Sequence, residues 1–126
     1  MHETLDLFKT AAAMARHAGA RQSVVARNIA NADTPGFRAQ DVLPFEQAMQ
    51  NTSHQLQVTR PGHVTSGENI FATQVITTDA EPSPNGNTVA LEDELLKSVS
   101  VSRDHDKAIS IYRHAMTVLR TSLGKM

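Results

Sequence analysis

Two long stretches of the chain repeat apolar or small side chains at alternating spacings of three and four residues. This spacing places the repeated positions along one side of an α-helix. It predicts a first helix over residues 3–31 and a second over residues 89–123. The first stripe comprises Leu5, Phe8, Ala12, Ala15, Gly19, Gln22, Ala26 and Ile29. The second comprises Leu91, Leu95, Ser98, Ser102, His105, Ile109, Tyr112, Met116, Leu119 and Leu123.

Acidic side chains begin each expected helix and basic side chains end it, as the helix dipole favours. An antiparallel pair would bring the acidic start of one helix to the basic end of the other, whereas a parallel pair would oppose like charges. The sequence therefore predicts an antiparallel pair. The charges concerned are Glu3, Asp6, Arg21, Arg27, Glu92, Asp93, Glu94, Arg120 and Lys125.

The segment between the helices has turn and strand composition. Pro35 disfavours helical geometry at Thr34, and the pair Pro35-Gly36 suits the centre of a type II turn, so the first helix ends there. Residues 41–87 are rich in Gln, Thr, Ser, Asn, Pro and Gly, and Asn69 to Asp79 favours one or two short strands.

These features predict a mainly α protein, in which two long terminal helices form an antiparallel, coiled-coil-like domain with a small irregular or β insert. The expected division is residues 1–40 for the first helix and its turn, 41–87 for the insert and 88–126 for the second helix. All three segments would belong to one discontinuous domain.

The length of the helices bears on what covers their stripes. At 1.5 Å per residue each helix would extend about 40 to 50 Å, more than a two-helix domain covers by itself. Aromatic residues make up 4% of the chain, so the interface would rest on small side chains. Much of the apolar surface would then face other subunits. From the stripes alone, an ordinary intramolecular hairpin that buries them is the alternative.

Composition argues against several classes of function. The net charge of −1 gives no general attraction to nucleic acid or to anionic membranes, and no stretch approaches a membrane span. Without Cys there is no thiolate metal site, and the six His residues lack the spacing of a helical metal site. Neighbouring helix positions such as Asp104, His105 and Asp106 diverge and cannot share one substrate. We expect no catalytic residue, metal or cofactor.

The most specific motif lies at the end of the first helix, within residues 21–41. Its core consists of Asn28, Ile29, Ala30, Asn31, Ala32, Asp33, Thr34, Pro35 and Gly36. This segment closely resembles the N-terminal motif of flagellar basal-body rod proteins. Arg60 to Val64 and Asn87 to Glu94 are similar to the short, proximal-rod members of that family, and the resemblance spans nearly the whole chain.

The resemblance implies a structural subunit of the proximal rod, which assembles helically, transmits torque and lines the export channel. It implies contacts with copies of the chain, with other rod and axial proteins, with the MS ring and with the base of the export gate. It also implies export by the flagellum-specific type III apparatus without a cleaved signal. A small helical adaptor or secretion-chaperone-like module is the alternative, which would fold alone as a monomer or dimer.

The polar residues of the motif have a simple expected role. Asn28, Asn31 and Asp33 can bond free carbonyl or amide groups close to the helix end. Contacts of Asn28 or Asn31 with other subunits are the alternative.

Overall fold

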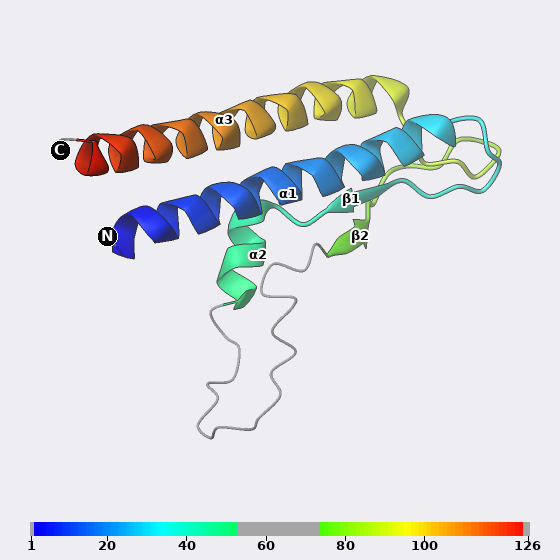
Figure 1. Cartoon of the computed structure of the whole chain (residues 1–126). Helices are drawn as coiled ribbons and strands as arrows, with labels where there is room; N and C mark the ends of the chain where they lie inside the picture. The colour runs from blue at the N-terminus through cyan, green and yellow to red at the C-terminus, as the bar shows by residue number, and fades with distance from the viewer. Residues whose placement is uncertain (1, 53–73, 125–126) are drawn as a thin grey trace.

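The computed structural model describes residues 2–52 and 74–124 (Figure 1). The fold is mainly helical, with two long helices separated by a small strand-containing insert, which confirms the predicted fold class. In chain order the elements are α1 (His2–Ala30), β1 (Gln40–Val42), α2 (Phe45–Thr52), β2 (Val75–Thr77) and α3 (Leu91–Leu123).

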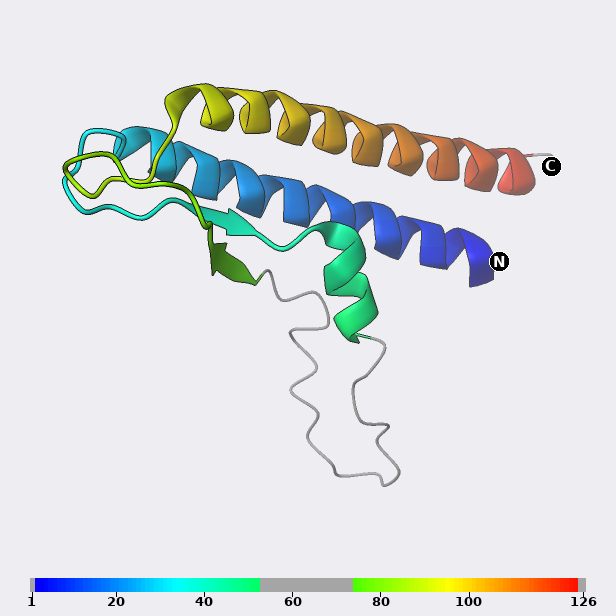
Figure 2. The ribbon, with the colours of Figure 1, turned by 180° about the vertical axis from the view of Figure 1, so that it is seen from behind.

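Helices α1 and α3 form an antiparallel hairpin, as the charges predict. The start of α1 and the end of α3 lie at its open end, and the loops that follow α1 and precede α3 lie together at its closed end (Figures 1 and 2). Near the open end the Phe8 and Tyr112 rings meet edge to face with their centroids 5.1 Å apart. Nearer the closed end Gln22 Nε2 donates to Ser98 Oγ over 3.3 Å.

The seam between the two helices is made of small side chains at seven-residue intervals. All are buried, and Ala108 and Ala115 have no exposed surface. Small side chains let two helix backbones approach closely. The seam comprises Ala11, Ala18 and Val25 in α1 and Val101, Ala108 and Ala115 in α3.

The predicted stripes do not form this seam but lie beside it, where Phe8 meets Tyr112 and Gln22 bonds to Ser98. Ala12 and Ile109, for example, each come one residue after a seam position. One residue turns a helix by about 100°. When two antiparallel helices face each other, a rotation of about 100° along the chain direction of each helix points to the same side of the pair. Both stripes therefore lie on one broad side of the hairpin. We call this side the stripe face.

The insert lies on the opposite side of α1. Arg21 Nε contacts Asp41 Oδ1 over 3.2 Å, and His17 Nε2 lies 2.6 Å from the carbonyl oxygen of Leu43. Arg21 and His17 occupy the side of α1 away from Gly19 and Gln22, which belong to the stripe. In both views α1 lies between α3 and the insert (Figures 1 and 2).

β1 and β2 form a two-stranded antiparallel sheet in which Gln40 opposes Thr77 and Val42 opposes Val75. β2 falls within the segment Asn69 to Asp79, whose composition favours strands; residues 69–73 of that segment lie outside the described residues, as do residues 60–64 and 125. Among the described helices, none combines the length and the hydropathy that crossing a bilayer requires.

Candidate assembly interface

The closed end of the hairpin begins with the turn of the sequence motif. Phe37 N–H donates to the carbonyl oxygen of Thr34 over 3.2 Å, and Gly36 has a φ of 73°. A positive φ at the third position of the turn is what type II geometry requires, and glycine adopts it without strain. The expected stop of the first helix is confirmed, since α1 ends at Ala30.

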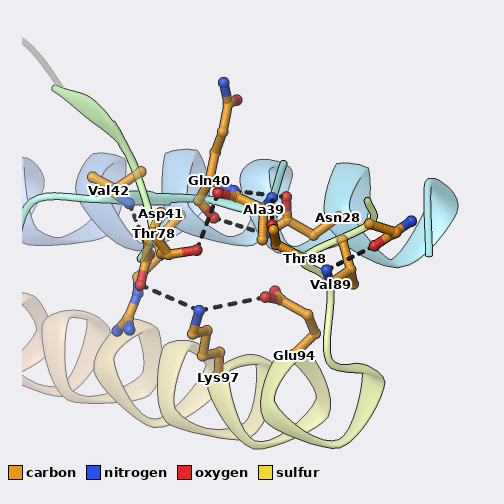
Figure 3. A network of polar contacts seen from close by, with 12 residues as sticks. Asn28, Ala39, Gln40, Asp41, Val42, Thr78, Thr88, Val89, Glu94 and Lys97 are labelled. Atoms are coloured by element: carbon orange, nitrogen blue, oxygen red, sulfur yellow. Dashed lines mark hydrogen bonds and ion pairs between the residues drawn. The ribbon is translucent and has the colours of Figure 1, made fainter. Parts of the chain in front are cut away.

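Asn28 does not bond locally, contrary to the expectation. Its side chain is fully buried, and it joins α1 to β1 by two hydrogen bonds to the backbone of Gln40 (Figure 3). Asn28 Nδ2 donates to the Gln40 carbonyl over 2.7 Å, and Gln40 N–H donates to Asn28 Oδ1 over 3.1 Å. The Asn28 amide thus bonds both the C=O and the N–H of one strand residue, as a neighbouring strand would. It therefore fixes where the insert begins.

Asn31 does act locally, as expected. Its Nδ2 donates to the carbonyl of Arg27 over 2.8 Å, and its Oδ1 accepts from the Thr34 hydroxyl over 3.2 Å. Asp33 is exposed, and so are Thr34, Pro35 and Gly36. The motif therefore presents a polar turn at the closed end, with its buried anchor at Asn28.

Asn87 completes the closed end, a role that neither its turn-rich surroundings nor its place in the family-like stretch Asn87 to Glu94 indicated. Its Nδ2 donates to three carbonyl oxygens that follow the last turn of α1, those of Asn31 at 2.9 Å, Ala32 at 2.9 Å and Thr34 at 2.8 Å. Its Oδ1 accepts from Val89 N–H over 2.7 Å. A single buried amide thus joins the segment that follows α1 to the start of α3.

Thr88 extends this connection to the strand. Ala39 N–H donates to Thr88 Oγ1 over 2.7 Å, and Thr88 N–H donates to the Phe37 carbonyl over 3.0 Å. We call the bonds that Asn87 and Thr88 make to residues 31–39 the clasp. The clasp joins the segment after α1 to the segment before α3.

A polar network crosses from the insert to α3 beside the clasp (Figure 3). Lys97 Nζ lies 3.3 Å from Glu94 Oε1 and 3.7 Å from Asp41 Oδ2, while Asp41 also contacts Arg21. Glu94 is 1% exposed, and its Oε2 has no hydrogen-bond partner in the described part of the chain. Lys97 is therefore the cation that balances a buried carboxylate.

Removing this cation should destabilise the fold. A buried ion that loses its partner costs about 3 kcal/mol or more, so we expect Lys97→Met to lower the free energy of unfolding by about 3 kcal/mol in urea titrations. The double variant Lys97→Met with Glu94→Gln removes both charges and should recover most of that loss. An equal loss in the single and the double variant would contradict the assignment.

The stripe face carries the predicted stripe residues in two states of exposure. The half-buried ones are Phe8, Ala12, Ala15, Ile29, Ser98, Ile109, Met116 and Leu119. The exposed ones are Leu5, Gly19, Gln22, Ala26, Leu91, Leu95, Ser102, His105, Tyr112 and Leu123. The face is apolar toward both ends of the hairpin and small or polar in the middle.

A groove of about 320 Å³ hollows the middle of the stripe face. Ala18 and Val101 of the seam form its floor, and the stripe residues form its walls. The wall residues are Gly19 and Gln22 on α1 and Ser98, Ser102 and His105 on α3.

Comparison with known proteins bears on what this face does. Residues 11–38 match the model of a family described as flagella basal body rod protein. The chain is 36% identical to the flagellar basal body rod protein FlgB of Agrobacterium fabrum over 93% of each chain. This chain belongs to the FlgB family of flagellar basal body rod proteins. It is also 32% identical to FlgB of Aeromonas hydrophila, over 82% of this chain and 81% of that protein.

Membership of the FlgB family makes the chain a structural rod subunit of the flagellar basal body rather than an enzyme. The segment that matches the family model includes the α1 seam, Asn28 and the turn at Gly36. The similarity to FlgB of Agrobacterium fabrum extends over nearly the whole chain. The interface of interest is therefore one between subunits.

Proposed function

We propose that this chain builds the proximal rod by helical assembly and that the stripe face is the surface that neighbouring subunits cover. The observation that supports the proposal is the exposure of large apolar side chains on both helices, with Leu5 at 54% and Leu95 at 54%. Large exposed apolar side chains at both ends of one face, with a small or polar middle between them, favour a surface that a protein partner covers. The hairpin does not bury it by itself.

In this proposal the neighbours are copies of the chain and other rod and axial proteins, with the MS ring and the export-gate base adjoining the first subunits. The polymer transmits torque and surrounds the export channel. The subunit reaches it through the flagellum-specific type III apparatus with no cleaved signal. Identical subunits that add through two different surfaces form an open helix when the rotation does not close.

A carboxylate on the stripe face tests the proposal. Leu5 is exposed in the isolated hairpin, so Leu5→Asp should leave the helix content unchanged, as measured by circular dichroism. We expect it to block incorporation into basal bodies, because burial of an unpaired carboxylate against a neighbour costs several kcal/mol. Motility in soft agar and immunoblots of purified basal bodies measure the effect.

Thr117→Asp is the matched control. Thr117 is exposed and lies two residues after the seam residue Ala115, about 200° around α3 from it, and so away from the stripe face. This variant adds the same carboxylate and should be incorporated. Normal motility of Leu5→Asp would defeat the proposal.

The adaptor alternative predicts a different state of the purified chain. An adaptor would melt cooperatively as a monomer or dimer with both stripes covered, whereas a rod subunit gains stability on polymerising. Sedimentation and thermal melting over a range of protein concentrations separate the two.

A further inference from the structure

A second apolar feature lies outside the predicted stripes. Leu96 is 70% exposed, and Val99 is 53% exposed. The two residues are three apart, so they lie on neighbouring turns of the same side of α3. This side faces neither α1 nor the insert, because Leu96 follows the buried Glu94 by two residues and lies about 200° around the helix from it. We call Leu96 and Val99 the knob.

The knob and the groove lie at nearly the same level of α3. The α3 wall of the groove runs from Ser98 to His105, which begins within the turn that carries Val99. One subunit thus presents a protruding apolar pair and a hollow at one height, on two different sides. Two different sides at one height suit a contact that repeats from copy to copy.

The size of the groove fits the knob. A cavity of about 150 Å³ accommodates benzene. A groove of about 320 Å³ with Ala18 and Val101 as its floor therefore has room for the ends of both aliphatic side chains. The glycine wall at Gly19 leaves the approach open, since an added Cβ there meets no atom within 4 Å.

Charged side chains beside the knob and the groove can pair only when the two copies point the same way. Arg103 follows Val99 by one turn, and Asp106 follows Ser102 by one turn, so a cation continues the knob and an anion continues the groove wall. Both residues are exposed, and neither takes part in an ion pair within the described residues. When two copies point the same way, Arg103 of one reaches Asp106 of the next.

From the groove, the knob and these charges we infer that Leu96 and Val99 of one copy seat in the groove of the next copy, in a heterologous contact between identical subunits. The inference rests on the proposed function and names the partner of the stripe face as a second copy in parallel orientation. Burial of the knob removes from water the most exposed large apolar side chain of the described chain.

Cysteine crosslinking tests the contact cleanly, because the chain has no Cys of its own. Leu96→Cys and Ser102→Cys in one chain cannot bridge internally, since six residues of helix separate their Cα atoms by about 9 Å, beyond disulfide reach. Basal bodies are purified from a strain that carries the variant in place of its own copy, then oxidised. We expect a ladder of crosslinked oligomers from the double variant and monomer from each single variant.

Each other outcome has a definite meaning. Dimers from Ser102→Cys alone would show that stripe faces meet each other, and an adduct with a different protein would show another occupant; both overturn the inference. Monomer from the double variant in basal bodies that contain it overturns the inference and leaves the proposed function intact. Absence of the chain from basal bodies of a motile strain overturns both.

Exchanging the charges of Arg103 and Asp106 tests the same contact independently. Arg103→Asp should reduce the crosslinked fraction of the double-cysteine chain several-fold, and adding Asp106→Arg to it should restore that fraction. If the crosslinked fraction falls equally in Arg103→Asp and in the exchanged variant, the two copies do not meet in parallel orientation.

Discussion

Asn87→Asp should undo the closed end of the hairpin. The substitution replaces an amide that donates to three carbonyl oxygens at 2.8 to 2.9 Å with a carboxylate oxygen at the same place. The variant loses the bonds that the two Nδ2 hydrogens share among these carbonyls, and it gains repulsion at a site where Asn87 is 3% exposed. We expect the free energy of unfolding to fall by about 4 kcal/mol, which combines the loss of buried hydrogen bonds with the burial of an unpaired charge.

Two further variants separate the causes. Asn87→Ala removes the bonds without the charge and should cost about 2 kcal/mol. Asp33→Asn is the control, because it alters an exposed carboxylate of the same turn and should have almost no effect. Hydrogen exchange of residues 27–37 should rise most in Asn87→Asp. Protection equal to that of the unaltered chain would show that the clasp does not hold α1.

Ala108→Leu should separate the two long helices. Ala108 has no exposed surface and belongs to the small-residue seam, so three added carbon atoms have no space between the backbones. Overpacking of this kind costs about 3 kcal/mol at its upper range, and here the whole hairpin must open to relieve it. Urea unfolding monitored by circular dichroism measures the loss.

Ala26→Leu is the matched control, since Ala26 is an exposed helical position of α1 one residue after the seam. The same three carbon atoms there should change the free energy of unfolding by less than about 0.5 kcal/mol. Equal destabilisation by the two variants would mean that the seam does not lie where the structure places it.

The sequence was sufficient for the two long helices, their direction and their ends, but the prediction of an irregular or β insert missed the short helix α2. Pro35 and Gly36 stop the first helix by backbone geometry, which acts locally and can be read from two residues. The charges at the helix ends indicated the antiparallel pairing, because the dipole and the partner helix ask for the same arrangement.

Which positions of each helix form the seam could not be predicted in the same way. Residues Ala11, Ala12 and Ala13 are identical, and Ala18 stands next to Gly19, so the small side chains give no signal for which position faces the partner. The larger apolar residues set the predicted phase, and they belong to the stripe face instead. Small residues form the seam because backbone approach, rather than side-chain size, decides that contact.

Long-range polar bonds were also beyond the sequence. Asn28 reads as a helix-end residue, yet its partner is Gln40, and β1 itself has little strand composition. Glu94 reads as a charge that favours a helix start, yet it is buried against Lys97. Such roles depend on which segments meet in space, which no local pattern contains.

The clasp and the polar network all gather at one end of the hairpin, while the open end has the Phe8 and Tyr112 rings and exposed leucines. The chain is therefore mechanically asymmetric. Its closed end is held by hydrogen bonds and ion pairs of the chain itself, whereas among the described residues no hydrogen bond or ion pair joins α1 to α3 on the open-end side of the Phe8 and Tyr112 rings. The helix ends there depend on packing alone, so a subunit that covered them would add the stiffness that the chain's own polar bonds give at the other end.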